Sequence, residues 1–110
     1  MTMPHIISAP ELASWLSDDQ RVKPLLLDVR EIREVELCQI SASVHMPMQT
    51  VPARINELDP DAEIVCICHH GARSMQVANF LKQNGYDKVF NLTGGIHAWA
   101  TQVDQSMQTY

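Results

Sequence analysis

Short apolar runs that end in polar residues constrain the fold of this chain most. Residues 24–30 and 63–68 form two such runs, and strands buried on both faces of a parallel sheet have this continuous apolar pattern. Residues 88–92 predict a third strand, and residues 43–46 predict a short extended segment before a proline. Parallel strands need crossover connections, which are usually helical. The runs therefore predict a small, mainly parallel sheet.

Helical periodicity fills the stretches between these runs. Ser8 and Glu11 form a capping-box pattern, which predicts a helix over residues 10–17. A surface helix is predicted to begin at a Thr50 cap and to stop at Pro60. Further helices are predicted over residues 31–37, 73–84 and 96–102. Strands that alternate with helices predict an α/β fold with helices on both faces of the sheet.

The length of the chain, 110 residues, is that of one domain. Hydrophobic residues make up 45% of the chain and charged residues 19%, the balance of an ordinary globular domain with its own core. Residues 1–103 are therefore predicted to form a single domain. The polar segment 104–110 is predicted to be a tail that frays.

The charge of the chain argues against several classes of partner. Eight basic and thirteen acidic residues give a formal net charge of -5, and the basic residues do not cluster, so nucleic-acid binding is not expected. No apolar run reaches the roughly 18 residues that a membrane-spanning helix needs. Residues 1–10 lack the basic start and apolar stretch of a signal peptide. These features predict a cytoplasmic protein without a membrane partner.

One of the three cysteines has the surroundings of a reactive thiol. An odd number of cysteines without an export signal favours reduced thiols over a disulfide framework. Cys68 ends an apolar run and is followed by a short loop and a predicted helix start, whose free N–H groups and dipole stabilise a thiolate. Gly71 suits the positive φ that such a loop needs. Ligands bind beyond the carboxyl ends of parallel strands, so Cys68 and Asp28 are expected at the same edge of the sheet.

These residues also have other interpretations. Cys68 is equally consistent with a small buried side chain at a strand end, and Cys66 is interpreted as inert core packing. His69 and His70 add to a dense set of potential metal ligands, but their spacing does not match the separated ligand pairs of structural zinc, so no metal is predicted. The two histidines either make the loop mouth more positive when protonated or are solvated loop residues.

Three motifs occur together in this chain: residues 27–30 with Glu34, residues 68–74 and residues 91–99. Over residues 6–100 they resemble the single-domain rhodanese family, whose members are sulfurtransferases. The resemblance implies a rhodanese-like α/β fold. It also implies that Cys68 takes the outer sulfur of thiosulfate or another persulfide-type donor, becomes a persulfide and passes the sulfur to cyanide or a thiol, without a cofactor.

The resemblance further implies roles for the residues around this cysteine. The loop that would bind the anionic part of the substrate consists of His69, His70, Gly71, Ala72, Arg73 and Ser74. Arg73 either contacts the anion or ties down the loop, and we favour the second role. Asp28 and Arg30 would brace the loop from a strand end. The other interpretation of these two residues is structural only: Arg30 would form an ordinary exposed ion pair with Glu31 or Glu34.

One segment departs from the family pattern. Cys38 and Ala42 stand where the family commonly has glycines. Because both residues carry a Cβ, a different turn geometry is predicted for residues 38–43. The segment is outside the loop, so activity is still expected, and Cys38 would be an oxidation site if exposed.

Two other functions compete with sulfur transfer. Phosphatases and arsenate reductases of a similar fold have five residues between their cysteine and arginine, whereas four separate Cys68 from Arg73. The shorter loop makes a smaller cradle, which suits a sulfur atom better than a phosphate. A non-catalytic binding or sensing module usually lacks the loop cysteine. The sequence thus favours a sulfurtransferase with a small-molecule sulfur donor, a thiol or cyanide acceptor, and a sulfur-relay protein as a further partner.

Overall fold

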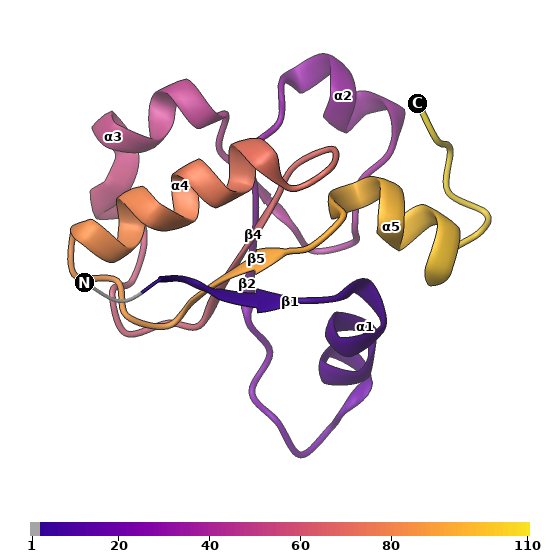
Figure 1. Cartoon of the computed structure of the whole chain (residues 1–110), viewed down its shortest axis with the longest axis horizontal. Coiled ribbons are helices and arrows are strands. Elements are labelled where there is room, and N and C mark those ends of the chain that lie inside the picture. Colours follow the sequence, from indigo (N-terminus) through magenta and orange to yellow (C-terminus); the bar gives the residue numbers. More distant parts are fainter. Residues whose placement is uncertain (1–2) are drawn as a thin grey trace.

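A computed structural model describes residues 3–110 and contains one sheet of five strands (Figure 1). The strands are β1 (His5–Ile7), β2 (Leu25–Asp28), β3 (Val44–His45), β4 (Ile64–Ile67) and β5 (Val89–Leu92). Their order in the sheet is β1-β5-β4-β2-β3, and every neighbouring pair is parallel. The predicted parallel sheet is confirmed, and β4, which precedes Cys68, is its central strand.

Helices cover both faces of the sheet, as predicted. Two of them, α1 (Ala9–Ser17) and α5 (Gly95–Gln102), pack on one face. On the other face lie α3 (Val51–Arg54) and α4 (Ala72–Gln83), while α2 (Ile32–Leu37) connects β2 to β3. Within residues 3–110 no helix is long and apolar enough to cross a membrane.

The central strands β2 and β4 are buried on both faces. Leu27 and Cys66 belong to the core beneath α3 and α4, whereas Leu26 and Val65 belong to the core beneath α1 and α5. All four side chains are almost fully buried. Successive side chains of a strand point to opposite faces, so a strand covered on both sides must be apolar at every position. This is the physical origin of the continuous apolar runs in the sequence.

The start of α1 has the predicted capping box. The Glu11 N–H donates to Ser8 Oγ at 3.2 Å, and the Ser8 N–H donates to Glu11 Oε1 at 2.8 Å. Both bonds satisfy N–H groups that the first helical turn would leave unpaired. On its inner face the helix buries Trp15, whose Nε1–H donates to the Val22 carbonyl at 2.9 Å. The cap therefore fixes where the chain turns from β1 onto the sheet.

The sequence analysis did not predict β1. The strand has only three residues and lies at the sheet edge beside β5, with Ile6 paired to Asn91. Ile6 is 67% exposed and Ile7 is 8% exposed, so the segment has no continuous apolar character. The hydrogen bonds to β5 define this strand, and nothing in a three-residue pattern reveals them.

The helix predicted from Thr50 to Pro60 is wrong as a single element. The chain forms a 3-10 turn over Met48–Thr50, the one-turn helix α3 and a second 3-10 turn over Ile55–Glu57. Thr50 stands at the N-cap position of α3, as predicted, but its side chain makes no capping bond, because its Oγ1–H donates to the Pro47 carbonyl at 2.7 Å. The Tyr86 hydroxyl donates to the Ile55 carbonyl at 2.8 Å. The same carbonyl accepts from the Leu58 N–H at 3.0 Å, the i+3 bond of the second 3-10 turn, so Tyr86 contacts the segment where regular α-helix has already ended.

The segment 38–43, for which a different turn geometry was predicted, contains one left-handed residue. Ala42 has a φ of 68° and is the one non-glycine residue with positive φ among residues 3–110. The turn is closed by the Ser43 N–H, which donates to the Ile40 carbonyl at 3.2 Å. Cys38 has a φ of -167°, extended backbone that any residue adopts. The added Cβ therefore causes strain at Ala42 and none at Cys38.

The tail for which we predicted fraying follows a defined path. Val103 and Met107 pack against the core beneath α1 and α5. The chain then turns back, and its last described residue lies beside α2 (Figure 1). There the Tyr110 hydroxyl is bonded to Arg30 and Glu34. The division of the chain at residue 103 stays a prediction.

Candidate active site

The loop that carries Cys68 is held between the central strand and the start of α5. Cys68 directly follows β4. The Ile96 N–H donates to the Cys68 carbonyl at 2.8 Å, and the His97 N–H donates to the His69 carbonyl at 3.1 Å. A Cβ at Gly95 would overlap both of these carbonyls, so only glycine permits the close approach of α5. The glycine pair after β5 is thus part of the loop's support.

Gly71 shapes the loop itself. It precedes α4 and has a φ of 112°, the positive value expected from the sequence. Because of this conformation, the Gly71 N–H points back into the loop and donates to Cys68 Sγ at 3.0 Å. A residue with a Cβ would be strained at this φ. The geometry required by the loop therefore explains the glycine.

The sulfur of Cys68 is surrounded by hydrogen-bond donors. The residue is 1% exposed, and Ser74 Oγ lies 3.3 Å from Sγ, in addition to the Gly71 N–H. Burial alone would raise the pKa of the thiol, but the Ser74 hydroxyl and the N–H groups of Ser74, Gly71 and His70 outweigh it and lower the pKa. A lowered pKa increases the thiolate fraction at neutral pH, and the thiolate is the nucleophilic form.

Cys66 provides a comparison within the same strand. It is completely buried in the core beneath α4. Burial, with a smaller contribution from Cys68, raises the pKa of this thiol to about 12. Cys66 is therefore protonated at neutral pH, which fits the predicted role of core packing.

Arg73 is paired with a carboxylate of α2. Its Nη1 and Nη2 donate to Glu34 Oε1 and Oε2 at 2.7 and 2.8 Å, a two-pronged geometry that fixes both side chains. The hydrogen bonds from Arg73 are the main reason why the pKa of Glu34 falls to about 2. The structure thus places the guanidinium on Glu34, where it ties the first turn of α4 to α2.

Asp28 and Arg30 form a buried ion pair. Arg30 Nη2 lies 2.7 Å from Asp28 Oδ2, and the two side chains are 0% and 1% exposed. The alternative of an exposed ion pair with Glu31 or Glu34 is therefore wrong. Arg30 also donates to the main-chain carbonyls of Glu34 at 3.3 Å and of Cys38 at 2.7 Å. The Glu34 carbonyl also accepts from the Cys38 N–H at 3.4 Å. Arg30 thus holds the end of α2 and its C-cap, and so the ion pair positions α2 beside the loop.

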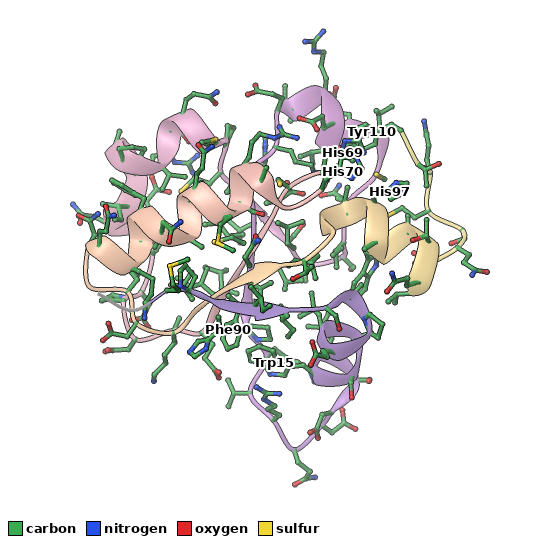
Figure 2. All side chains as sticks on the ribbon, viewed as in Figure 1. Trp15, His69, His70, Phe90, His97 and Tyr110 are labelled. Atoms are coloured by element: carbon green, nitrogen blue, oxygen red, sulfur yellow. The ribbon has the colours of Figure 1, made fainter. Side chains whose placement is uncertain are left out.

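Three histidine rings and one tyrosine ring gather beside the loop (Figure 2). The centroids of His69 and His70 are 3.9 Å apart, and those of His70 and His97 are 5.2 Å apart. Tyr110 stacks on His69, with centroids 3.9 Å apart and planes inclined by 10°. Burial, and then the charge of His70, lower the pKa of His69, so its ring is neutral at pH 7. The exposed His70 and His97 form the outer side of the cluster.

Tyr110 also links the tail to the ion pairs around α2. Its hydroxyl accepts from Arg30 Nη1 at 3.0 Å and donates to Glu34 Oε2 at 2.8 Å. Burial raises the pKa of this hydroxyl to about 12, so it keeps the proton it donates. The sequence analysis assigned no role to Tyr110, since its partners are remote in the chain and nothing local marks them.

The sequence analysis also missed Asn91 as a contact of the loop. Its side chain is buried, with Nδ2 donating to the Gly71 carbonyl at 3.1 Å and Oδ1 bonded to the Ser74 hydroxyl. A buried amide is unusual in a strand between apolar neighbours, because it needs partners for both of its ends. The polar residue between Phe90 and Leu92 was the signal available in the sequence.

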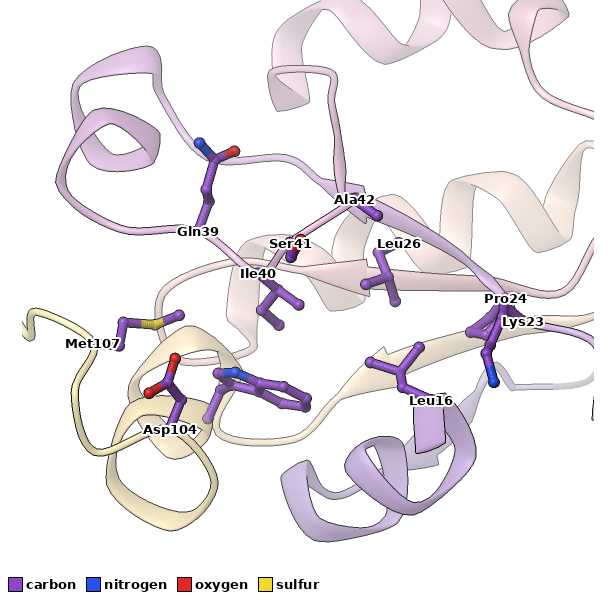
Figure 3. A pocket seen from close by; sticks show the side chains of 11 residues that line it. Leu16, Lys23, Pro24, Leu26, Gln39, Ile40, Ser41, Ala42, Asp104 and Met107 are labelled. Carbon is purple, nitrogen blue, oxygen red and sulfur yellow. The ribbon is translucent and has the colours of Figure 1, made fainter. Parts of the chain in front are cut away.

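The part of the chain that the structure describes contains no group of three His, Cys, Asp or Glu side chains arranged to hold a metal ion. A cavity of about 510 Å³ lies away from the loop, on the face covered by α1 and α5 (Figure 3). Leu16, Ile40 and Trp99 contribute to its walls, and no residue of the loop 68–74 does.

Comparison with known proteins connects this arrangement to a family. The profile of the rhodanese-like domain family matches residues 8–102. A protein named sulfurtransferase from Allochromatium vinosum is 39% identical over 98 residues, which cover 89% of this chain and 90% of that protein. The thiosulfate sulfurtransferase GlpE of Pseudomonas syringae is 33% identical over 96 residues, which cover 87% of this chain and 88% of that protein.

Solved structures have the same fold. The crystal structure of a rhodanese-like domain protein from Staphylococcus aureus superposes with a TM-score of 0.82 at 29% identity. The match covers 98% of this chain and 99% of that one. The similarity therefore extends over the whole sheet and all of its helices.

Proposed function

The chain belongs to the rhodanese-like domain family, and from this premise we propose that it transfers sulfane sulfur through a persulfide on Cys68. Its sulfurtransferase-named relatives support a rhodanese-type sulfurtransferase. The observation that carries the proposal is the surroundings of the Cys68 sulfur, which receives the Gly71 N–H at 3.0 Å and lies 3.3 Å from the Ser74 hydroxyl. These donors stabilise a negative charge on sulfur at the end of the central strand.

In the first step the Cys68 thiolate attacks the outer sulfur of thiosulfate or of another sulfane donor. A sulfur–sulfur bond to Cys68 forms while the sulfur–sulfur bond of the donor breaks. With thiosulfate, sulfite leaves with the electron pair of the broken bond. The negative charge moves to the outer sulfur of the persulfide, where free N–H groups at the start of α4 stabilise it.

In the second step an acceptor nucleophile removes the outer sulfur. Cyanide or a thiolate attacks that sulfur, and the bond to Cys68 breaks with its electron pair returning to the cysteine. The thiolate is regenerated, and with cyanide the product is thiocyanate. Each step exchanges one bond to sulfur for another, so the cycle requires no cofactor.

The remaining residues have positioning roles in this proposal. His69, His70, Gly71 and Ala72 form the wall of the loop around the anion, and Ser74 faces the sulfur. Arg73 supports the loop rather than the substrate, because both of its Nη atoms are bonded to Glu34. Asp28 and Arg30 brace the same region through α2.

The test of the function is the intact mass of the protein after incubation with thiosulfate. The wild-type protein is expected to gain one sulfur atom, and cyanide is expected to remove it as thiocyanate. Cys68→Ser should gain none. Cys66→Ser is the matched control in the same strand and should still load sulfur, because that thiol stays protonated in the core. Sulfur loading of the Cys68→Ser protein would contradict the assignment.

The competing functions predict different outcomes in this experiment and in two further assays. A binding or sensing module would gain no sulfur from thiosulfate or from a protein persulfide. Hydrolysis of an aryl phosphate would indicate a phosphatase, but the four-residue spacing and the pairing of Arg73 with Glu34 leave no guanidinium directed at a phosphate. A protein persulfide that loads Cys68 would support the expected sulfur-relay partner.

A further inference from the structure

Asn91 connects two of the groups that contact the Cys68 sulfur. It lies on β5, which pairs with β4, and its main chain is in register with Cys66. The side chain is 4% exposed, so its amide must find partners inside the protein. It bonds to the Gly71 carbonyl and to the Ser74 hydroxyl, and both of these residues also contact the sulfur.

The orientation of the Asn91 amide follows from its partners. A carbonyl oxygen only accepts hydrogen bonds, so the amide group 3.1 Å from the Gly71 carbonyl must be the Nδ2 donor. The Oδ1 atom then faces the Ser74 hydroxyl and must accept from it. The main chain of the loop thus determines which end of the amide Ser74 meets.

Ser74 has one hydroxyl hydrogen and two acceptors for it. One acceptor is Asn91 Oδ1, and the other is Cys68 Sγ at 3.3 Å. A thiol at Cys68 donates to Ser74 Oγ, which leaves the hydroxyl hydrogen for Asn91. A thiolate attracts the hydroxyl hydrogen, because hydrogen bonds to a charged acceptor are the stronger ones. In a persulfide the inner sulfur is uncharged, and the hydrogen returns to Asn91.

We propose that Asn91 is a positioning residue for Cys68: it competes with the sulfur for the Ser74 hydroxyl hydrogen and accepts that hydrogen whenever the sulfur is uncharged. The role in the catalytic cycle rests on the proposed function of Cys68. Through its bond to the Gly71 carbonyl, Asn91 also holds the residue whose N–H donates to the sulfur. Asn91 therefore acts on Cys68 without touching it.

Other charged and titratable groups also act on Cys68. Cys66 of β4 and Arg73 of α4 interact with it electrostatically, and Arg73 is itself paired with Glu34 of α2. The loop residues His69 and His70 directly follow Cys68 in the chain. None of them bonds to Asn91 or to the Ser74 hydroxyl in the described part of the chain. Their influence is the same in every protein compared below, so it cancels from the comparison.

The test measures how Asn91 and Ser74 together affect the ionisation of Cys68. The rate of Cys68 alkylation by iodoacetamide is followed against pH in the wild type, Asn91→Leu, Ser74→Ala and the double variant, with the modified residue located by peptide fragmentation. Leucine is nearly isosteric with asparagine but takes no hydrogen. In the protein that keeps Ser74, Asn91→Leu frees the hydroxyl hydrogen for the thiolate, whereas in the Ser74→Ala background there is no hydrogen to free.

The expected result is a pKa change that depends on Ser74. We compare the change in the pKa of Cys68 that Asn91→Leu causes in the protein that keeps Ser74 with the change it causes in the Ser74→Ala background. The first change should be lower than the second by at least about 0.4 pH unit, which corresponds to the smallest coupling energy usual for contacting residues. The same change in both backgrounds would overturn the proposal, since a merely structural role of Asn91 does not require the Ser74 hydroxyl. Loss of the Gly71 contact affects both backgrounds alike and cancels.

A second variant keeps the proposal testable if the leucine protein does not fold. Asn91→Asp retains an acceptor for Ser74 and strengthens it with a charge. The carboxylate should raise the pKa of Cys68 more in the protein that keeps Ser74 than in the Ser74→Ala background, and equal increases would overturn the proposal.

Because alkylation needs no sulfur donor, this outcome is independent of the proposed function. Persulfide formation without coupling rejects the role of Asn91 alone. Coupling without persulfide formation rejects the sulfur-transfer function alone.

Discussion

Ala42 shows how one residue stores strain in this fold. Its φ of 68° lies in the left-handed region, where an L-residue with a Cβ is disfavoured by roughly 1–2 kcal/mol. The neighbouring Ser43 N–H is bonded to the Ile40 carbonyl, so the turn keeps its shape despite that cost. The strain lies outside the loop of Cys68, and its removal should change stability without changing the site.

Ala42→Gly is therefore expected to stabilise the protein by about 0.5–1 kcal/mol, because relief of the left-handed strain exceeds the extra entropy of the unfolded chain. Urea unfolding at neutral pH measures the difference. Ala13→Gly in the middle of α1 is the matched control, and it should destabilise the protein by about 0.5–1 kcal/mol, since helical backbone gives glycine no advantage. Destabilisation by both substitutions would show that Ala42 is not strained.

At the scale of elements, α2 is positioned mainly by polar contacts. It has six residues, of which only Val35 is buried. Arg30 donates to the carbonyls of Glu34 and Cys38, and the Glu34 carboxylate is paired with Arg73. A short helix with so little apolar burial gains little from packing, so these contacts determine its place beside the loop.

The ion pair between α2 and α4 should make stability depend on pH. The pKa of Glu34 is about 2 in the folded protein against an ordinary 4.5, chiefly because of Arg73. A lowered folded-state pKa means that its stabilisation is complete above pH 4.5 and is lost as the pH falls toward 2. Glu34→Gln is therefore expected to destabilise the protein at pH 7, by about 1 kcal/mol after allowance for solvent screening of this partly exposed pair.

Chemical unfolding of both proteins from pH 7 to pH 2 checks this expectation, since their stabilities should converge as Glu34 becomes protonated. Glu57→Gln is the control, because the Arg54–Glu57 pair is exposed and joins residues of one short segment. Its effect should be smaller at every pH. A constant difference between wild type and Glu34→Gln across the range would mean that the ion pair is not its cause.

At the scale of the whole molecule, the tail connects the α5 side of the fold to the loop of Cys68. Val103 and Met107 lie against the core beneath α1 and α5, and Tyr110 stacks on His69, the residue after Cys68. The Tyr110 hydroxyl is bonded to Glu34, 76 positions earlier in the chain. The tail therefore covers one side of a loop whose cysteine is already almost inaccessible.

Tyr110→Ala is expected to make Cys68 react several-fold faster with iodoacetamide, because the loss of the stacked ring uncovers the loop and increases local opening. Tyr110→Phe separates the ring from the hydroxyl. It keeps the stack on His69, loses the bonds to Arg30 and Glu34, and should give an intermediate rate. Equal rates for all three proteins would show that the tail does not limit access to the sulfur.

Predictability from the sequence differed between local and long-range features. The capping box at Ser8, the strands over the continuous apolar runs and the helix after Gly71 are local patterns, and the structure contains them. The strand β1 depends on its partner β5, and the 3-10 turns that replace the predicted helix near Thr50 contact Tyr86, 31 positions after Ile55. No local pattern contains that information.

The candidate site divides in the same way. Cys68 and Gly71 were identified from the sequence, because a strand, a short loop and a helix start place a cysteine before free N–H groups wherever they occur. The partners of these residues were not identified: Asn91 and Tyr110 come from segments that are distant in the chain. For Arg73 the sequence left two roles, contact with the substrate anion or support of the loop, and we favoured the second. Its pairing with Glu34 was visible only in the structure.

The sequence alone determined the fold class and the location of the candidate catalytic cysteine. Burial on both faces requires apolar strands, and the residues around Cys68 that set its backbone geometry are its neighbours in the chain. Only the tertiary structure decided which side chains meet. The pairing of α2 with α4 and the position of the Asn91 amide beside Ser74 result from the order β1-β5-β4-β2-β3. Such contacts depend on which elements pack against one another, and a local sequence pattern does not specify the neighbours of an element in space.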